Sequence, residues 1–323
     1  MSTTTPVRRH ERAAATMSRL EIWAATPTPF DAEGRLDVSI VPAQVAHLQA
    51  GGVHGAFVTG TTGEFAAMST DERRRLVEAW AAARPVGFGL AAHVGGTEPG
   101  QAVELAAHAE GLGLDFIASV APYYGEAPTI DLVVDHLRTI AAAAPATALC
   151  YYHIPSMTGS THRPSEIVSR AAELIPTLRG VKFTDGDLME YDRTRASSTH
   201  VRVYFGRDEL LPAALSFGAD AVIGSLYNGL APIAHRVTEA FDTGDHPLAF
   251  ELHRPYRDIA SASRRHGGLG FVKELMNELT PDCGRPRNPW GPLHGRDRAA
   301  ASALAPALRR VLTDASARKR ATA

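Results

Sequence analysis

The chain has 323 residues, which is enough for one large barrel-type domain or two ordinary domains, and its formal net charge is −2. With no basic stripe and no long block of like charges, nucleic acid is not expected as a partner. No apolar run reaches the roughly 18 residues that a membrane-spanning helix needs. Residues 1–19 are polar and lack the apolar core of a signal peptide, so we interpret them as a disordered extension. Two cysteines, Cys150 and Cys283, are too few for a disulfide framework, and the sequence predicts a cytoplasmic protein.

Lysine is rare in this chain, and one of its three lysines lies within an apolar run. Lys182 is flanked by Leu178, Val181 and Phe183, a pattern that predicts a short buried strand. Arginine supplies nearly all the other positive charge. A guanidinium stays protonated, whereas a buried amine can lose its proton and attack a carbonyl group. Lys182 is therefore a candidate nucleophile, and the alternative is a lysine that snorkels to the surface or pairs with an acid.

From about Leu20 onward, strand-like apolar runs alternate with helical stretches. The predicted strands cover Ile22–Thr26, Gly55–Thr59, Val86–Ala92, Asp115–Val120, Ala148–Ile154, the run around Lys182, Val201–Phe205 and Ala221–Gly224. The predicted helices cover Val38–Gln49, a helix that opens at Thr70 as its N-cap, Gly100–Glu110, Thr129–Ala144, Pro164–Leu174 and Asp208–Phe217. This repeated alternation favours a (β/α)8 TIM barrel over a doubly wound sheet.

The remainder of the chain, after Tyr227, has only helical patterns. The predicted helices there are Pro232–Phe241, Pro247–Arg265, Phe271–Leu279 and Arg296–Leu312. We therefore divide the chain into a disordered N-terminal extension (1–19), a barrel catalytic domain (20–228), a C-terminal helical extension (229–313) and a disordered tail (314–323).

Polar side chains gather where the predicted strands end, and in TIM barrels the chemistry sits at the C-terminal ends of the strands. The residues at these ends are Gly60-Thr61-Thr62-Gly63-Glu64 after strand two, Tyr123-Tyr124 after strand four, Tyr152 in strand five, Lys182 and Thr184 in strand six, Gly206, Asp208 and Glu209 after strand seven, and Ser225 after strand eight. We expect these hydroxyls, carboxylates and the one lysine to converge at one mouth of the barrel.

Each of these features also has an ordinary structural explanation. The loop 60–64 is either a tight turn or a cradle whose N–H groups and hydroxyls hold a small anion such as a carboxylate. Tyr152 is either a barrel-interior aromatic or a proton carrier, and the pair Asp208-Glu209 either caps the next helix or binds a ligand. The histidines show no metal-ligand spacing, so we predict no metal, and we expect no cofactor.

Three motifs in fixed order, Gly-Thr-Thr-Gly-Glu at 60–64, Tyr-x-x-Pro at 152–155 and Gly-Val-Lys at 180–182, carry a family resemblance. From about Leu20 to Tyr227 the chain resembles the pyruvate-dependent class I aldolases, which include dihydrodipicolinate synthase and N-acetylneuraminate lyase. The resemblance implies that Lys182 forms a Schiff base with pyruvate, that Tyr152 relays protons and that Thr61 orients Tyr152. It also implies that Thr62 and the loop N–H groups hold the pyruvate carboxylate. Finally, it implies that Tyr124 reaches the site of a neighbouring subunit within a homotetramer built from tight dimers.

Further details resemble the sialic acid lyase branch of this family. They are Tyr-Tyr-His-Ile-Pro at 151–155, Gly-Val-Lys-Phe-Thr-Asp at 180–185, Phe-Gly-Arg-Asp-Glu at 205–209 and Gly-Ser-Leu-Tyr-Asn at 224–228. The resemblance implies that the sugar-derived hydroxyl chain is contacted by Thr184, Gly206, Asp208, Glu209 and Ser225. Met157 stands where dihydrodipicolinate synthases usually carry a carboxylate-binding arginine, and a thioether cannot pair with a carboxylate. Leu226 departs from the lyase branch, where threonine is common.

By this resemblance the chain cleaves N-acetylneuraminate to pyruvate and N-acetylmannosamine. Two alternatives stay open: another pyruvate-dependent enzyme (dihydrodipicolinate synthase, or a sugar-acid aldolase or dehydratase), and a non-catalytic barrel that binds a keto acid. The joint presence of Lys182, Tyr152 and Thr61 favours an enzyme. The expected partners are a small-molecule substrate, pyruvate with an aldehyde or sugar, and further copies of the chain, without nucleic acid or membrane.

Overall fold

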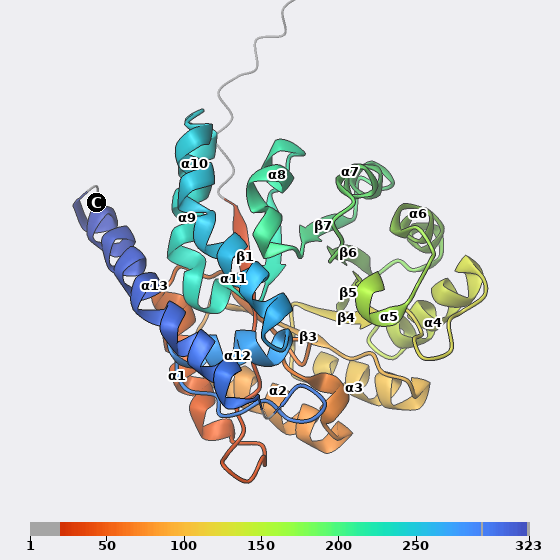
Figure 1. Ribbon diagram of the computed structural model, residues 1–323. Coiled ribbons are helices and arrows are strands. Elements are labelled where there is room, and N and C mark those ends of the chain that lie inside the picture. The colour runs from red at the N-terminus through yellow and green to blue at the C-terminus, as the bar shows by residue number, and fades with distance from the viewer. Residues whose placement is uncertain (1–19, 292, 322–323) are drawn as a thin grey trace, which may run out of the picture.

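The protein is described here by a computed structural model that covers residues 20–291 and 293–321, with side chains up to residue 313. Within these residues, eight parallel strands close into a barrel in chain order, with β1 pairing both β2 and β8 (Figure 1). The strands are β1 Glu21–Ala25, β2 Gly55–Val58, β3 Gly89–His93, β4 Phe116–Val120, β5 Ala148–His153, β6 Leu178–Phe183, β7 Arg202–Phe205 and β8 Ala221–Gly224. The predicted TIM barrel is confirmed. The predicted N-terminal extension lies outside the described residues.

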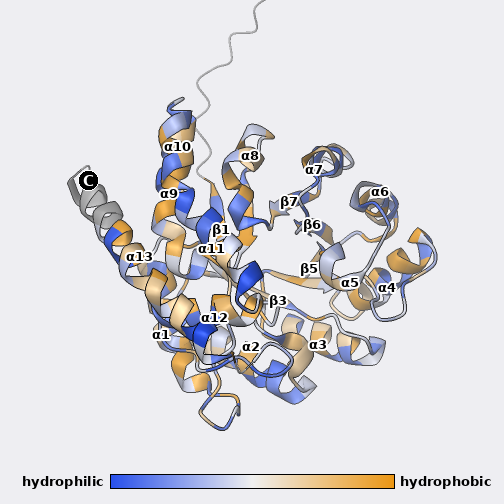
Figure 2. Cartoon of the chain, in the orientation of Figure 1, coloured by the Kyte–Doolittle hydropathy of each residue, from blue (hydrophilic) through white to orange (hydrophobic). Residues whose placement is uncertain are grey.

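Helices surround the strands as an outer layer (Figure 1). They are α1 Val41–Ala50, α2 Thr70–Ala83, α3 Pro99–Gly111, α4 Ile130–Ala142, α6 Pro164–Leu174, α7 Leu188–Ala196, α8 Leu211–Ser216 and α9 Tyr227–Asp242. Short helical turns at the strand ends are η1 Val38–Ile40, η2 Phe65–Ala67, α5 Pro155–Thr158 and η3 Asp208–Leu210. These helices carry both hydrophobic and hydrophilic residues (Figure 2), as expected for amphipathic helices that pack one face on a sheet.

The C-terminal helices lie along one side of the barrel (Figure 1). They are α10 His246–Leu252, α11 Arg254–Arg265, α12 Leu269–Asn277 and α13 Gly295–Ala321, and α13 contacts both α9 and α12. Helix α9, which begins next to the predicted boundary at residue 228, contacts β1 and β8 and completes the outer layer. Helix α13 continues through residues 314–321 of the predicted tail, where no glycine or proline interrupts it. The last two residues lie outside the described part.

Two separate apolar cores hold the barrel together. The larger lies between the strands and the helices and includes Leu90, Leu137, Val181 and Phe205. The smaller fills the barrel interior with Trp23, Phe57, Phe116, Cys150, Tyr152 and Ile223, together with smaller side chains. Inward and outward side chains alternate along each strand, so Val181 and Lys182 lie on opposite faces of β6.

Several predicted boundaries differ from the structure for identifiable reasons. Ser69, not Thr70, is the N-cap of α2, because its hydroxyl and the Glu72 carboxylate form a reciprocal capping box. Strand β3 begins at Gly89, since Val86 is fully exposed before a turn with Gly87 at φ 84°. The single predicted helix Pro247–Arg265 is two helices, because Pro255 lacks an N–H and starts a new first turn.

Helix α7 is absent from the sequence prediction. Its buried residues are Glu190, Tyr191 and Thr194, so its core-facing side is largely polar and shows no apolar periodicity. Within the described part of the chain, no helix is both long enough and apolar enough to span a membrane.

Candidate active site

Lys182 lies on β6 inside the barrel, and its side chain is shielded from solvent by aromatic rings. The residue is 4% exposed. Its Nζ atom lies 3.9 Å from the centre of the Tyr152 ring and 4.7 Å from the centre of the Phe57 ring. In the described residues it has no ion-pair partner. Neither structural alternative for this residue, a snorkelling lysine or an ion-paired lysine, describes what is observed.

Tyr152 lies directly beside Lys182, because β5 and β6 pair Tyr152 with Lys182 in register. Its hydroxyl oxygen lies 3.1 Å from Thr61 Oγ1. Its ring packs edge-on against Phe57 and His93, with ring centres 5.9 and 5.8 Å away. Burial lowers the pKa of His93 well below its ordinary value, so the imidazole beside Tyr152 is neutral. The tyrosine hydroxyl is thus held by one polar partner within an apolar wall.

The loop 60–64 follows β2 and supplies two hydroxyls to the mouth. Two non-glycine residues in the left-handed region bound it: Thr59, which precedes it, at φ 52°, and Glu64, its last residue, at φ 57°. Hydrogen bonds from Glu64 N–H to the Thr61 carbonyl (3.0 Å) and from Phe65 N–H to the Gly60 carbonyl (3.3 Å) close it, and neither uses the N–H of Thr62. Thr62 Oγ1 lies 2.6 Å from Ser225 Oγ, which joins the loop to the end of β8.

Asp208 is a buried carboxyl group at the end of β7, and it does not cap its own helix. Its Oδ2 accepts a hydrogen bond from the Leu226 N–H at 2.8 Å, while Oδ1 has no hydrogen-bond partner among the described residues. A Cβ atom on Gly224 would lie 1.5 Å from Asp208 Oδ1, so only glycine leaves room for this carboxyl group. Burial raises the pKa of Asp208 to about 7, although the Leu226 N–H opposes the shift.

Thr184, Gly206 and Glu209 lie near the same strand ends. Thr184 Oγ1 is buried without a hydrogen-bond partner in the described residues, and a Cβ on Gly206 would lie 2.3 Å from it. Glu209 pairs with Arg207 at 3.0 Å. Since buried polar atoms are nearly always hydrogen-bonded, the unpartnered Thr184 Oγ1 and Asp208 Oδ1 have hydrogen-bonding capacity that the described residues do not use.

Two residues from the sequence analysis lie outside this buried cluster. Tyr124, at φ 72°, is fully exposed (101%) in the turn after β4, so a single chain does not bring it to Lys182. Met157 lies in α5 and is 56% exposed, and it places a thioether rather than a positive charge there.

Sequence reasoning missed the residues that lie behind the loop 60–64. In the sequence Glu64 is only the last residue of a motif, whereas in the structure it is buried and hydrogen-bonded to Lys273 and to the Arg287 backbone. The signal was available, because Lys273 is the second of only three lysines and also lies in an apolar run.

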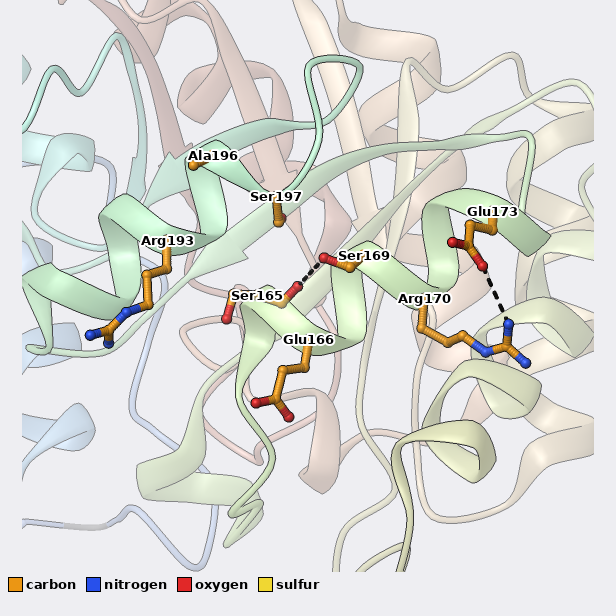
Figure 3. A pocket seen from close by; sticks show the side chains of 8 residues that line it. All are labelled: Ser165, Glu166, Ser169, Arg170, Glu173, Arg193, Ala196 and Ser197. Carbon is orange, nitrogen blue, oxygen red and sulfur yellow. Dashed lines mark hydrogen bonds and ion pairs between the residues drawn. The ribbon is translucent and has the colours of Figure 1, made fainter.

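A surface groove of about 580 Å³ lies between α6 and α7, away from these residues (Figure 3). Its two arginines already have partners: Arg170 pairs with Asp131 and Glu173, and Arg193 with Glu190. Among residues 20–291 and 293–321, no group of three or more His, Cys, Asp or Glu side chains is arranged to hold a metal ion. We assign the groove no role.

Comparison with known proteins gives a consistent result. Residues 19–308 match the Dihydrodipicolinate synthetase family. The chain is 38% identical to N-acetylneuraminate lyase of Mus musculus over 273 residues, covering 82% of this chain and 85% of the mouse protein. It is 38% identical to the Homo sapiens enzyme of the same name over 274 residues, with the same coverage of 82% and 85%. The structure of Proteus mirabilis N-acetylneuraminate lyase superposes with a TM-score of 0.86 at 33% identity, covering 90% of this chain and 98% of that one.

The fold and these similarities define the class of protein: it is a lyase on a TIM-barrel scaffold. More particularly, the chain belongs to the dihydrodipicolinate synthetase family.

Proposed function

We propose that this chain is a Schiff-base aldolase that cleaves N-acetylneuraminate to pyruvate and N-acetylmannosamine. The observation that carries the proposal is the placement of Lys182, buried and without a charged partner in the described residues, against the ring of Tyr152, whose hydroxyl is held by Thr61. The similarity to several proteins named N-acetylneuraminate lyase supports the choice of substrate. Lyase chemistry of this kind needs an electron sink next to the bond that breaks, and an imine on a lysine supplies one.

In this mechanism the neutral amine of Lys182 attacks the 2-keto group, and loss of water gives an imine. The protonated imine takes up the electron pair of the breaking carbon–carbon bond and becomes an enamine. The Tyr152 hydroxyl relays the proton of the C4 hydroxyl to the substrate carboxylate, giving up its own proton as it takes up the new one, and the C4 hydroxyl becomes the aldehyde of the leaving sugar. The same relay returns the proton to the enamine carbon, and hydrolysis of the imine then releases pyruvate and restores the amine.

The remaining residues divide between the two ends of the substrate. Thr62 and the N–H groups of its loop hold the keto-acid carboxylate. The hydroxyl chain of the sugar is bound by Thr184, Gly206, Asp208, Glu209 and Ser225. Support for the second group comes from the unpartnered buried atoms Thr184 Oγ1 and Asp208 Oδ1, which match hydroxyl groups better than a second carboxylate.

The proposal extends to assembly and location. Full exposure of Tyr124 in a left-handed conformation fits a residue that a second subunit covers, and we propose a homotetramer of tight dimers. Light scattering at decreasing concentration tests this, and an active monomer that persists on dilution would contradict it. Both cysteines are free and buried, which fits our expectation of a cytoplasmic enzyme.

A substrate panel read out as pyruvate release or consumption tests the choice of substrate. We expect release of pyruvate from N-acetylneuraminate and poor condensation of pyruvate with aspartate semialdehyde. Met157 offers no positive charge, and a missing charge-assisted hydrogen bond costs roughly tenfold to a hundredfold in discrimination. Efficient condensation with aspartate semialdehyde and no cleavage of N-acetylneuraminate would assign the chain to the synthase branch.

A variant of Asp208 separates the two ends of the substrate. Asp208→Ala should raise the KM for N-acetylneuraminate or lower kcat, while borohydride trapping of pyruvate on Lys182 survives. Loss of pyruvate trapping in a folded Asp208→Ala protein would contradict the division of the site into a keto-acid end and a sugar end.

A further inference from the structure

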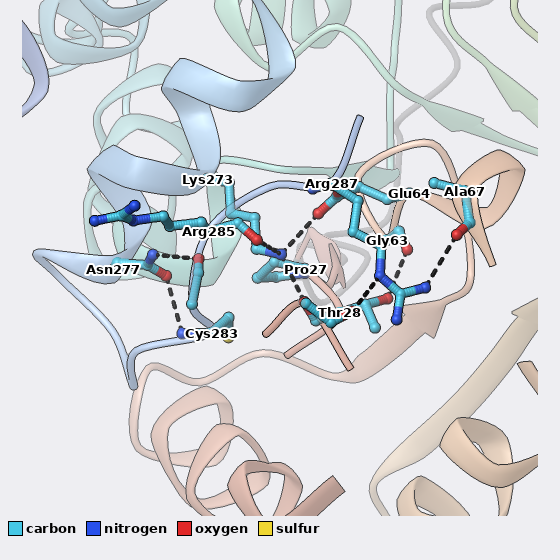
Figure 4. A network of polar contacts seen from close by, with 12 residues as sticks. Pro27, Thr28, Gly63, Glu64, Ala67, Lys273, Asn277, Cys283, Arg285 and Arg287 are labelled. Atoms are coloured by element: carbon cyan, nitrogen blue, oxygen red, sulfur yellow. Dashed lines mark hydrogen bonds and ion pairs between the residues drawn. The ribbon is translucent and has the colours of Figure 1, made fainter. Parts of the chain in front are cut away.

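A buried ion pair joins Glu64, the last residue of the loop 60–64, to Lys273 of the C-terminal helices. Lys273 of α12 donates to Glu64 Oε1 at 2.7 Å, and the two residues are 3% and 1% exposed (Figure 4). Burial lowers the pKa of Lys273, and the Glu64 carboxylate opposes that shift. The pair joins residues that are 209 positions apart in the chain.

The second carboxylate oxygen of Glu64 is bound by the segment that follows α12. Glu64 Oε2 accepts the Arg287 N–H at 2.6 Å. The Arg287 guanidinium in turn binds the Glu72 carboxylate at 2.6 Å and the Ala67 carbonyl at 3.0 Å. Residues 64–72 and the segment around Arg287 are therefore held against each other by at least three polar contacts.

Lys273 also reaches the loop by a second route. Its Nζ donates to the Thr28 carbonyl at 2.7 Å, and the Thr28 hydroxyl donates to the Gly63 carbonyl at 2.6 Å. Lys273 thus acts on both residues that follow Thr62: on Gly63 through Thr28, and on Glu64 directly (Figure 4).

The backbone of Glu64 is in a strained conformation that needs stabilising contacts. Glu64 is at φ 57°, in the left-handed region that costs a non-glycine residue free energy. Such a residue keeps that conformation only when its surroundings fix it, and here the carboxylate of Glu64 is fixed by Lys273 and Arg287. The positions of Thr61 and Thr62 follow from this turn, because Glu64 N–H closes it onto the Thr61 carbonyl.

We propose that Lys273 and Glu64 are positioning residues for the keto-acid carboxylate pocket, and that the C-terminal segment 273–287 belongs functionally to the active site. This inference rests on the proposed function, since it assumes that Thr62 and its loop bind the carboxylate of pyruvate. General stabilisation is a weaker explanation, because replacing a buried ion pair by well-packed apolar side chains is often neutral or stabilising. An ion pair at this place fixes the geometry of the loop.

The test measures imine formation on Lys182 with two ketones that differ in the carboxylate. Cyanoborohydride traps the imine, and mass spectrometry quantifies the adduct on the peptide that carries Lys182. Pyruvate has the carboxylate and acetone lacks it. The proteins compared are the wild type, Lys273→Met, the double variant Glu64→Leu with Lys273→Met, and Arg170→Gln as a control for the loss of an exposed ion pair.

We expect both Lys273 variants to need at least about tenfold more pyruvate for half-maximal trapping. In both variants the loop 60–64 has lost the hydrogen bonds from the Lys273 ammonium that hold it in position. Acetone trapping per folded protein should be unchanged, since Lys182 itself is untouched. The double variant should regain thermal stability relative to Lys273→Met without regaining pyruvate affinity, an outcome that a purely structural pair does not produce. Arg170→Gln should match the wild type in all three measurements.

An unchanged half-saturating pyruvate concentration in the folded double variant would overturn the inference. If Lys273→Met does not fold, Glu64→Gln, which keeps the size of the side chain and one acceptor oxygen, provides the same measurement. Absence of any pyruvate adduct on Lys182 in the wild type would instead refute the proposed function, so the two failures are distinguishable.

Discussion

Two buried lysines in this protein have opposite surroundings. Lys182 lies in the barrel interior against the rings of Tyr152 and Phe57 and has no carboxylate partner in the described residues. Lys273 lies outside the barrel, 2.7 Å from the Glu64 carboxylate and 2.7 Å from a backbone carbonyl. They are 4% and 3% exposed, so solvent does not distinguish them.

The two lysines differ in their partners rather than in their burial. The Glu64 carboxylate and a backbone carbonyl fix Lys273 as a hydrogen-bond donor, whereas Lys182, with no carboxylate partner in the described residues, is left available to react with a carbonyl group. The first arrangement suits positioning and the second suits nucleophilic attack. The predictions below test this contrast, from the largest expected effect to the smallest.

Substitution of Lys182 should abolish the chemistry. Lys182→Arg keeps a positive charge but cannot form an imine, so turnover should fall on the order of 10⁴-fold or more. The adduct with pyruvate and borohydride should disappear from the peptide that carries Lys182. An adduct on the Lys273 peptide would reverse the roles assigned to the two lysines. Full activity without any adduct would contradict the Schiff-base mechanism.

Stability should respond in opposite ways to the same substitution at the two sites. Lys273→Met leaves the Glu64 carboxylate buried and unpaired, which should lower the free energy of unfolding by about 3–5 kcal/mol. Lys182→Met removes an unpaired amine from an apolar interior, so the free energy of unfolding should stay the same or rise. Urea unfolding curves measure both, and equal losses would mean that the ion pair at Lys273 is not what distinguishes the two sites.

Asp208, like Lys182, is a buried ionisable residue without an oppositely charged partner in the described residues. Its carboxyl group accepts a hydrogen bond from the Leu226 N–H. Its pKa of about 7 exceeds the ordinary 3.8, so between these values the folded protein binds a proton that the unfolded chain does not. This contribution to stability is present at low pH and is lost as the pH rises through about 7. Asp208→Asn does not titrate and should therefore gain stability relative to the wild type across this window, by about 4 kcal/mol. A pH-independent difference in unfolding free energy would exclude the raised pKa.

An exposed ion pair should matter least. Arg170 pairs with Asp131 at 3.0 Å, but both side chains are exposed and screened by solvent. Arg170→Gln should change the free energy of unfolding by less than about 1 kcal/mol and leave kcat and KM unchanged. A loss as large as that of Lys273→Met would show that burial does not explain the importance of the Lys273–Glu64 pair.

The barrel could be predicted from the sequence because apolar runs such as Val201–Phe205 mark its strands and helical patterns recur between them. Helix α7 could not, since Glu190 and Thr194 face the core and give no apolar period. In the site, the neighbouring positions of Tyr152 and Lys182 follow from equivalent places on consecutive parallel strands. The contact between Thr62 and Ser225 joins segments 163 residues apart, and the distance between two such side chains cannot be predicted from local sequence patterns.

The contact between Glu64 and Lys273 could not be predicted for the same reason. Lys273 is conspicuous as one of three lysines and lies in an apolar run, but only the packing of α12 beside the loop shows that its partner is Glu64. From the sequence alone, Asp208 is as plausible a helix cap as a ligand-binding residue. The structure shows that its carboxyl group does not cap a helix but packs against Gly224 and accepts a hydrogen bond from the Leu226 N–H.

The long separation between Glu64 and its partners also bears on how the enzyme is made. Contacts with Lys273 and Arg287 span 209 and 223 residues, so they form only after nearly the whole chain has left the ribosome. A nascent chain that has already produced all eight strands still lacks the segment that fixes the loop. With the role proposed above for Lys273 and Glu64, competence to bind a keto acid is gained late in biosynthesis, because a chain that ends before α12 lacks the residues that contact the Glu64 carboxylate.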